Sequence, residues 1–271
     1  FVLVSPGLSP SADPLAGWLG YIASIFHLFS HARFRALLFL GAVCIIHAVH
    51  SNEMSAMGGL RRHMPVTHAT FLVACLAIAG IWPLSGFFSK DEILSAAFPF
   101  SPVMGWTMTF IAGLTAFYMF RLYYNIFWGR ENRTTHDGHA PHEAPATMTL
   151  PLVFLALVTP GAGWIPFGEF VSSDGAASAL RLDWSVAGVS LCVAAAGIAL
   201  ATWMYARPAQ PVADRLAARF GALPRAASHS FSIDEVYQVA THRVVFACLS
   251  APIPWFARHV LGGILTPTVP A

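Results

Sequence analysis

The chain has 271 residues, of which 56% are hydrophobic and 10% are charged, and its formal net charge is +2. This apolar excess excludes an ordinary soluble globular domain and predicts a membrane protein. Several apolar runs reach the roughly 20 residues that cross a hydrocarbon core, and they lack the alternation of barrel strands. The basic residues are dispersed between the runs, so no nucleic-acid partner is indicated.

Three regions are predicted along the chain. Residues 1–14 are interpreted as a loop-like or non-native start. They lack an initial Met and the features of a signal peptide, which suggests a fragment of a longer protein. Residues 15–205 are predicted to form a transmembrane helical domain of about five spans. Residues 206–271 are predicted to be an amphipathic tail, which the arginines that follow alternate spans place on the cytoplasmic side.

The first apolar segment, residues 15–49, carries ionisable side chains in its middle. His27, His31 and Arg35 are spaced four residues apart, which places them along one helical face. Ionisable groups at membrane depth are costly and commonly mark ion or proton paths. Two imidazoles one turn apart can pass a proton between waters, with Arg35 setting the local potential. The alternative is that both histidines only hydrogen-bond to neighbouring helices.

The second segment, residues 67–100, is interrupted by the stretch GIWPLSG. Pro83 removes a helical hydrogen bond and Gly86 loosens the backbone, so we expect a discontinuous helix. Lys90, the only lysine in the chain, follows this break and is adjacent to Asp91. A desolvated lysine can release its proton whereas a guanidinium keeps it, which makes Lys90 a candidate proton carrier. The alternative is an interfacial cluster in which Lys90 snorkels to water.

Three more apolar runs, residues 104–128, 147–166 and 186–205, are predicted to span the membrane. Before the second of these runs, the stretch HDGHAPHE offers three histidines and Glu143 as metal ligands, although a solvated loop is the favoured interpretation. The four cysteines are far apart in apolar stretches, so neither a disulfide framework nor a redox motif is indicated. We therefore expect neither a metal site nor a cofactor site.

Four stretches of the chain resemble a known family. They are FHLFSHARFRALLFLGAVCIIHAVHSNEMSAMGGLRRHMP, LAIAGIWPLSGFFSKDEIL, TAFYMFRLYY and SIDEVY. Together they look like the C-terminal part of subunit L of bacterial NADH-quinone oxidoreductase, respiratory complex I. The resemblance implies part of an antiporter-like inverted-repeat fold, with the tail stopping before the family's lateral helix. Lys90 then matches the lysine of the interrupted helix in the second half-channel, with Asp91 beside it, and His27 and His31 match the histidines of the preceding helix.

Three positions depart from the family pattern. Arg35 stands where the family usually has lysine, Arg33 replaces a customary Phe, and Trp82 replaces a customary Pro. Because a guanidinium hardly exchanges its proton, Arg35 is expected to bias a neighbouring proton electrostatically.

The resemblance implies a proton-translocating, multi-pass subunit in the bacterial inner (plasma) membrane. Its Lys/His relay would be coupled to redox chemistry in other membrane subunits of complex I, because the sequence has no flavin, iron–sulfur or quinone signature. Lipid and protons are the other expected partners. Two alternatives stay open: a subunit of an Mrp-type cation/proton antiporter, and a structural membrane scaffold or remnant that conducts nothing.

Overall fold

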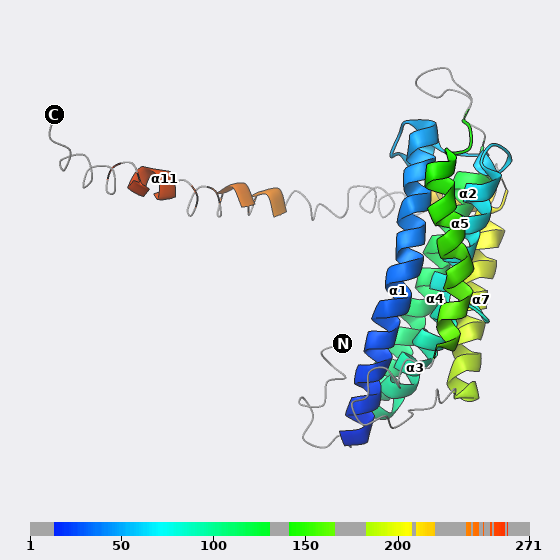
Figure 1. Cartoon of the computed structure of the whole chain (residues 1–271), viewed down its shortest axis with the longest axis vertical. Helices are drawn as coiled ribbons and strands as arrows, with labels where there is room; N and C mark the ends of the chain where they lie inside the picture. Colours follow the sequence, from blue (N-terminus) through cyan, green and yellow to red (C-terminus); the bar gives the residue numbers. More distant parts are fainter. Residues whose placement is uncertain are drawn as a thin grey trace. The chain divides into compact units, whose positions relative to one another are not determined.

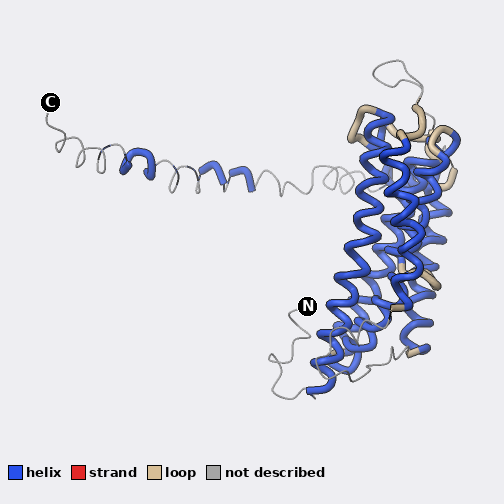
Figure 2. The backbone as a smooth tube through the Cα atoms, in the orientation of Figure 1, coloured by secondary structure: helices blue, strands red, loops and turns tan. Residues whose placement is uncertain are grey.

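The computed structural model describes residues 14–130, 141–165, 183–207 and 210–219, and short stretches between residues 237 and 259 (Figure 1). The chain divides into two compact units, residues 1–211 and residues 212–271. The first unit contains a bundle of α-helices, and the described residues include no strand (Figure 2). The helices of this bundle are α1 (Pro14–Val49), α2 (Pro65–Ala79), α3 (Ser85–Phe100), α4 (Pro102–Phe127), α5 (Ala146–Gly161) and α7 (Trp184–Tyr205), with the 3₁₀ turns η2 (Met54–Ala56), η3 (Leu60–Arg62) and η4 (Ala162–Trp164).

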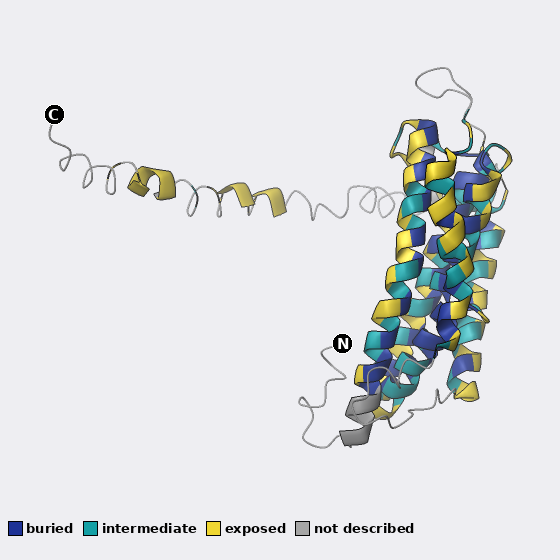
Figure 3. Cartoon of the chain, in the orientation of Figure 1, coloured by how far each residue is buried: buried dark blue, intermediate teal, exposed yellow. Residues whose placement is uncertain are grey.

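Within the described part of the chain, four stretches are long and apolar enough to cross a membrane. They are Gly20–Val49 in α1, Pro102–Phe127, Ala146–Trp164 and Trp184–Tyr205. The short helices α2 and α3, separated by residues 80–84, take the place of the remaining predicted span. Many large apolar side chains of the bundle are exposed, as lipid contact requires. Exposed residues lie along the outer sides of the helices (Figure 3). The predicted all-α, polytopic membrane fold with a discontinuous helix is therefore confirmed.

The main core joins α1, α2, α4 and α5. Leu37, Phe71, Phe127 and Leu152 from these four helices are buried in one cluster. Phe71 and Phe127 meet edge to face, with 5.6 Å between ring centroids. Such aromatic packing holds α2 against α4.

The loop between α1 and α2 meets the end of α4. The guanidinium of Arg61 lies 3.8 Å from the centroid of the Trp128 ring. Gly58 is packed so closely that a Cβ there would lie 2.0 Å from the Arg130 carbonyl oxygen. Arg61 and Arg130 thus lie at the same end of the bundle, as the distribution of arginines predicted; Arg133 is outside the described residues.

A close crossing joins α4 to α7. A Cβ on Gly197 would lie 2.5 Å from the Gly113 carbonyl oxygen, so the two backbones approach to a distance that only glycine permits. The Tyr124 and Thr202 hydroxyl oxygens lie 2.9 Å apart further along the same pair of helices. This crossing forms a rigid wall beside α3.

Glu143, which is distant from α2 in the sequence, caps the first turn of this helix. Its carboxylate accepts hydrogen bonds from the Val66 backbone N–H at 2.8 Å and from the Thr67 hydroxyl at 2.6 Å. A carboxylate is favoured there because the N-terminal N–H groups of a helix have no intrahelical acceptor. Glu143 therefore has a capping role. Two histidines of the suggested metal cluster, His136 and His139, lie outside the described residues. Among the described residues, no group of three or more candidate ligands occurs.

The second unit contains α8 (Pro211–Arg219) except for its first residue, and the short α11 (Pro252–Phe256). In α8, Asp214 lies in the first turn and Arg219 in the last, which suits the helix dipole at both ends. Asp234 and Glu235, in the stretch SIDEVY that contributed to the family resemblance, are outside the described residues.

Candidate functional site

The break between α2 and α3 is built by two glycines. Gly80 ends α2 with φ 80° and ψ 40°, a left-handed conformation that favours glycine. At the start of α3, a Cβ on Gly86 would lie 1.8 Å from the Ala77 carbonyl oxygen, so only glycine lets the two helices approach this closely. Pro83 lies between them, within the residues that join the helices.

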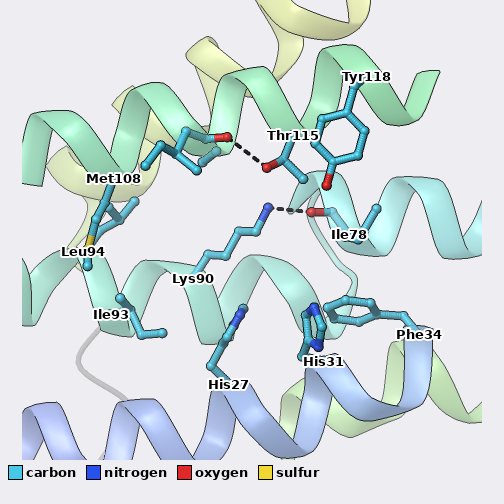
Figure 4. A pocket seen from close by; sticks show the side chains of 12 residues that line it. His27, His31, Phe34, Ile78, Lys90, Ile93, Leu94, Met108, Thr115 and Tyr118 are labelled. Carbon is cyan, nitrogen blue, oxygen red and sulfur yellow. Dashed lines mark hydrogen bonds between the residues drawn. The ribbon is translucent and has the colours of Figure 1, made fainter. Parts of the chain in front are cut away.

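Lys90 reaches back across this break. Its amine donates a hydrogen bond to the carbonyl oxygen of Ile78, in the last turn of α2 (Figure 4). The backbone N–H groups of Gly80 and Ile81 bond to the carbonyls of Ala77 and Leu76, 3.1 Å away in each case. An ammonium ion is stabilised at this position because carbonyl groups and the negative end of the helix dipole converge there.

The Lys90 side chain lines a cavity of about 370 Å³. The walls come from α1, the end of α2, α3 and α4, and His27 and His31 project into the cavity from α1 (Figure 4). The rings of these histidines lie 5.6 Å apart between centroids. His27 Nδ1 lies 3.1 Å from the hydroxyl oxygen of Ser89, the residue before Lys90. An amine and two imidazoles therefore share one cavity.

The α4 wall contributes groups that the sequence analysis did not single out. Thr115 lines the cavity, and its hydroxyl donates to the Ile111 carbonyl at 2.8 Å. Tyr118 also lines the cavity, and its hydroxyl points inward on the side of Lys90 (Figure 4). Their spacing of three residues puts both on one face of α4, but nothing in the sequence indicates that this face meets Lys90. The buried Ser89 was missed as well.

Asp91 occupies a different environment from its neighbour Lys90. Its side chain is only 2% exposed and does not line the cavity. Neither carboxylate oxygen has a hydrogen bond of normal geometry from the described residues, although both the backbone N–H and the charge of Asp183, at the start of α7, act on the group. Successive helical positions point about 100° apart, so an amine and a carboxylate at adjacent positions do not pair face to face.

The two arginines of α1 also lie apart from the cavity lining. Arg35 is exposed on the outer face of α1, with its guanidinium 5.4 Å from the Phe39 ring centroid. Its charge still acts on His31, one turn earlier. Arg33 is half-buried and stacks on Phe29 at 3.7 Å. The structure thus brings together Lys90, His27 and His31, and leaves Asp91 and Arg35 outside the lining.

This geometry defines a class of protein. Titratable side chains line a cavity beside an interrupted helix inside an apolar bundle, which is an arrangement found in membrane proteins that move ions. None of the described residues forms a metal-binding group, and the cavity walls are otherwise largely apolar.

Sequence comparison gives the family. Residues 12–115 match the family model described as NADH:quinone oxidoreductase/Mrp antiporter, transmembrane. The chain is 39% identical over 258 residues to NAD(P)H-quinone oxidoreductase chain 5 of Picosynechococcus sp., covering 80% of this chain and 39% of that protein. It is 39% identical over 221 residues to NADH-quinone oxidoreductase subunit L of Mycobacterium tuberculosis, covering 76% and 33%. It is 35% identical over 249 residues to the chloroplastic subunit 5 of Chlorokybus atmophyticus, covering 83% and 38%.

The chain therefore belongs to the family of antiporter-like membrane subunits of NADH-quinone oxidoreductases, and the resemblance to subunit L is confirmed. It spans only 33–39% of the length of these relatives.

Proposed function

We propose that the chain provides a proton-translocating site within a membrane subunit of an NADH-quinone oxidoreductase. The observation that carries the proposal is the position of Lys90. Its amine donates a hydrogen bond at the end of α2, and its side chain lines the same cavity as the imidazoles of His27 and His31. A cationic group fixed for structural reasons alone needs no second titratable group within the same cavity.

In this proposal the amine alternates between two states. The protonated amine is held by the Ile78 carbonyl at the end of α2. After losing its proton it is no longer drawn to the carbonyl dipoles, and the flexible lysine stem lets it turn toward the α1 wall. His31 and His27, one helical turn apart, accept and release protons through water in the cavity. Ser89 orients His27 through the contact at its Nδ1 atom.

The remaining parts of the mechanism belong to partners. We propose that electron transfer occurs in other subunits of the complex and that the chain lies in the bacterial inner membrane. The names of the relatives support the assignment to a quinone oxidoreductase, because those proteins are chains or subunits of such enzymes. Asp91, buried and outside the cavity, is proposed to act on the site through its charge. Arg35 is proposed to act electrostatically through His31.

The test uses Lys90→Met and Lys90→Arg in the complete subunit, reconstituted with its complex into vesicles. Met keeps most of the stem and cannot titrate, whereas Arg keeps a charge that it cannot release. Both variants are expected to reduce NADH-driven proton uptake about tenfold or more, in line with the loss of one proton-transfer group. Uptake is normalised to assembled complex, and Arg121→Met, an exposed position outside the cavity, is the matched control.

Full proton uptake by Lys90→Arg would contradict the proposal and favour a scaffold with a fixed structural cation. The family description also names Mrp antiporters, which keeps cation/proton exchange as a second candidate. Sodium-dependent transport without NADH or quinone in the same vesicles would favour that candidate.

A further inference from the structure

The α4 wall of the cavity presents two hydroxyl groups, from Thr115 and Tyr118, and they differ in what they can donate. The Thr115 hydroxyl donates to the Ile111 carbonyl at 2.8 Å, so it offers only lone pairs to the cavity. The Tyr118 hydroxyl points into the cavity on the side of the Lys90 amine (Figure 4), and none of the described residues hydrogen-bonds to it. Within the described part of the chain, Tyr118 is therefore a donor whose acceptor is still to be identified.

Two later tyrosines of α4 have hydroxyl partners. The Tyr123 hydroxyl oxygen lies 2.6 Å from His68 Nε2, and the Tyr124 hydroxyl oxygen lies 2.9 Å from that of Thr202. Tyr118 lies nine residues before the last residue of α4, which is about 13 Å along the axis of this membrane-spanning helix. A phenol hydroxyl at that depth is poorly solvated unless an acceptor binds it. Its acceptor therefore has to come from the cavity.

The Lys90 amine can accept from this donor in only one of its two protonation states. An ammonium group has three N–H donors and no lone pair, so it binds the Ile78 carbonyl and accepts nothing from a hydroxyl. A neutral amine has a lone pair, and a phenol keeps its own proton near neutral pH. A hydrogen bond from Tyr118 to Lys90 can thus exist only after the amine has released its proton.

Few other groups face the amine. His27 and His31 line the cavity from α1, and α2 contributes only Ile78. The charged neighbours on α3, Asp91 and Glu92, are outside the lining, and none of the described residues of α5 and α7 takes part in it. The two imidazoles accept protons in the proposed function, which leaves the hydroxyl of α4 as the donor for the neutral amine.

We propose that Tyr118 is a positioning residue that donates its hydroxyl hydrogen to the neutral Lys90 amine. The proton leaves the amine for water in the cavity, and the lone pair that remains on the nitrogen accepts the Tyr118 O–H before the side chain turns toward α1. A hydrogen bond that only the neutral form makes stabilises that form and so favours proton release. The inference rests on the proposed function of Lys90 and adds a residue of α4 to its site.

The test is Tyr118→Phe in the complete subunit, within its assembled complex in vesicles. Trace acetic anhydride acetylates neutral amines, and mass spectrometry follows the peptide that contains Lys90, the only lysine in the 271 residues. Loss of one hydrogen bond to the neutral form should lower the labelling rate about three- to tenfold wherever the ammonium predominates. The pH profile of NADH-driven proton uptake should move upward by about half to one unit for the same reason.

Two variants and one plateau serve as controls. Tyr124→Phe removes a hydroxyl from the same helix whose partner, Thr202, is outside the cavity lining, so both profiles should stay unchanged. Replacing Tyr118 with p-aminophenylalanine keeps an N–H donor in place of the hydroxyl and should retain most of the labelling rate. At a pH that deprotonates the amine fully, Tyr118→Phe and the unmodified subunit should be labelled at the same rate.

Two results would overturn the inference: an unchanged labelling profile in Tyr118→Phe, or a labelling rate that falls equally at every pH, which would indicate altered access to the cavity. Either result would leave the proposed function standing if Lys90→Met still reduced proton uptake. Full uptake by Lys90→Arg would instead contradict the proposed function, and this inference with it.

Discussion

The α2–α3 break and the α4–α7 crossing use glycine for opposite purposes. In the crossing, Gly113 and Gly197 bring two continuous helices into backbone contact and leave no room for a side chain between them. In the break, Gly80 and Gly86 bring the ends of two short helices together and leave a carbonyl available to the Lys90 amine. Close packing thus makes a wall in one region and a polar site in the other, and the difference is whether the helix continues through the contact.

The largest effect is expected from Gly86→Ala. A Cβ at this position would meet the Ala77 carbonyl at 1.8 Å, and neither backbone can yield without moving a helix end. We expect a destabilisation of about 3 kcal/mol or more, together with loss of proton uptake. Thermal unfolding in detergent, followed by tryptophan fluorescence, measures the first effect, and the vesicle assay measures the second. Gly188→Ala, with no atom within 4 Å of its Cβ, is the control; equal behaviour of the two variants would contradict the close approach.

A smaller effect is expected from Gly197→Ala in the crossing. The added Cβ would lie 2.5 Å from the Gly113 carbonyl, but two continuous helices can separate slightly along their length. The expected loss of stability is about 1–3 kcal/mol in the same thermal assay. Proton uptake per assembled complex should stay close to that of the unmodified protein. Were uptake lost as completely as in Gly86→Ala, the contrast between wall and site would be wrong.

The smallest effect is expected at the first residue before α7, where Asp183 accepts hydrogen bonds from the Ser185 hydroxyl and, at 3.0 Å, from the Ser185 backbone N–H. The Ser185 hydroxyl and N–H lower the pKa of Asp183 below its ordinary value of 3.8. A lowered pKa in the folded state contributes stability above the unfolded value, and this contribution is lost as pH falls through the folded value. Asp183→Ala should therefore lower the unfolding temperature slightly at pH 7, with the difference vanishing in acid. A difference that persists at pH 2 would indicate packing instead.

Much of the fold was predictable because its causes are local. Apolar length predicted the spans, and the combination of Pro83 with nearby glycines predicted the interruption of the second segment. The close crossing of α4 and α7 was not predictable, because Gly113 and Gly197 are distant in sequence and neither carries a local signal that it faces the other. The capping of α2 by Glu143 was missed for the same reason, since 76 residues separate Thr67 from its acceptor.

The site was predictable where helical periodicity decided the outcome. His27 and His31 share a face because they are four residues apart, and the structure places both in the cavity with Lys90. The same spacing predicted that Arg35 would share this face. A helix rotates by about 40° beyond a full turn every four residues, so Arg35, eight residues after His27, points away from the cavity. Tyr118 and Thr115 required the three-dimensional packing of α4 against α3, about which a single sequence gives no direct information.

The cap supplied by Glu143 has a consequence for the order in which the protein is made. Glu143 leaves the ribosome 77 residues after Val66, and its carboxylate accepts a hydrogen bond from the Val66 backbone N–H. Throughout the synthesis of α3 and α4, the first turn of α2 therefore lacks this acceptor and depends on water at the membrane surface. The N-terminal end of α2 is therefore completed only when the segment leading into α5 has emerged, well after α2 itself has been synthesised.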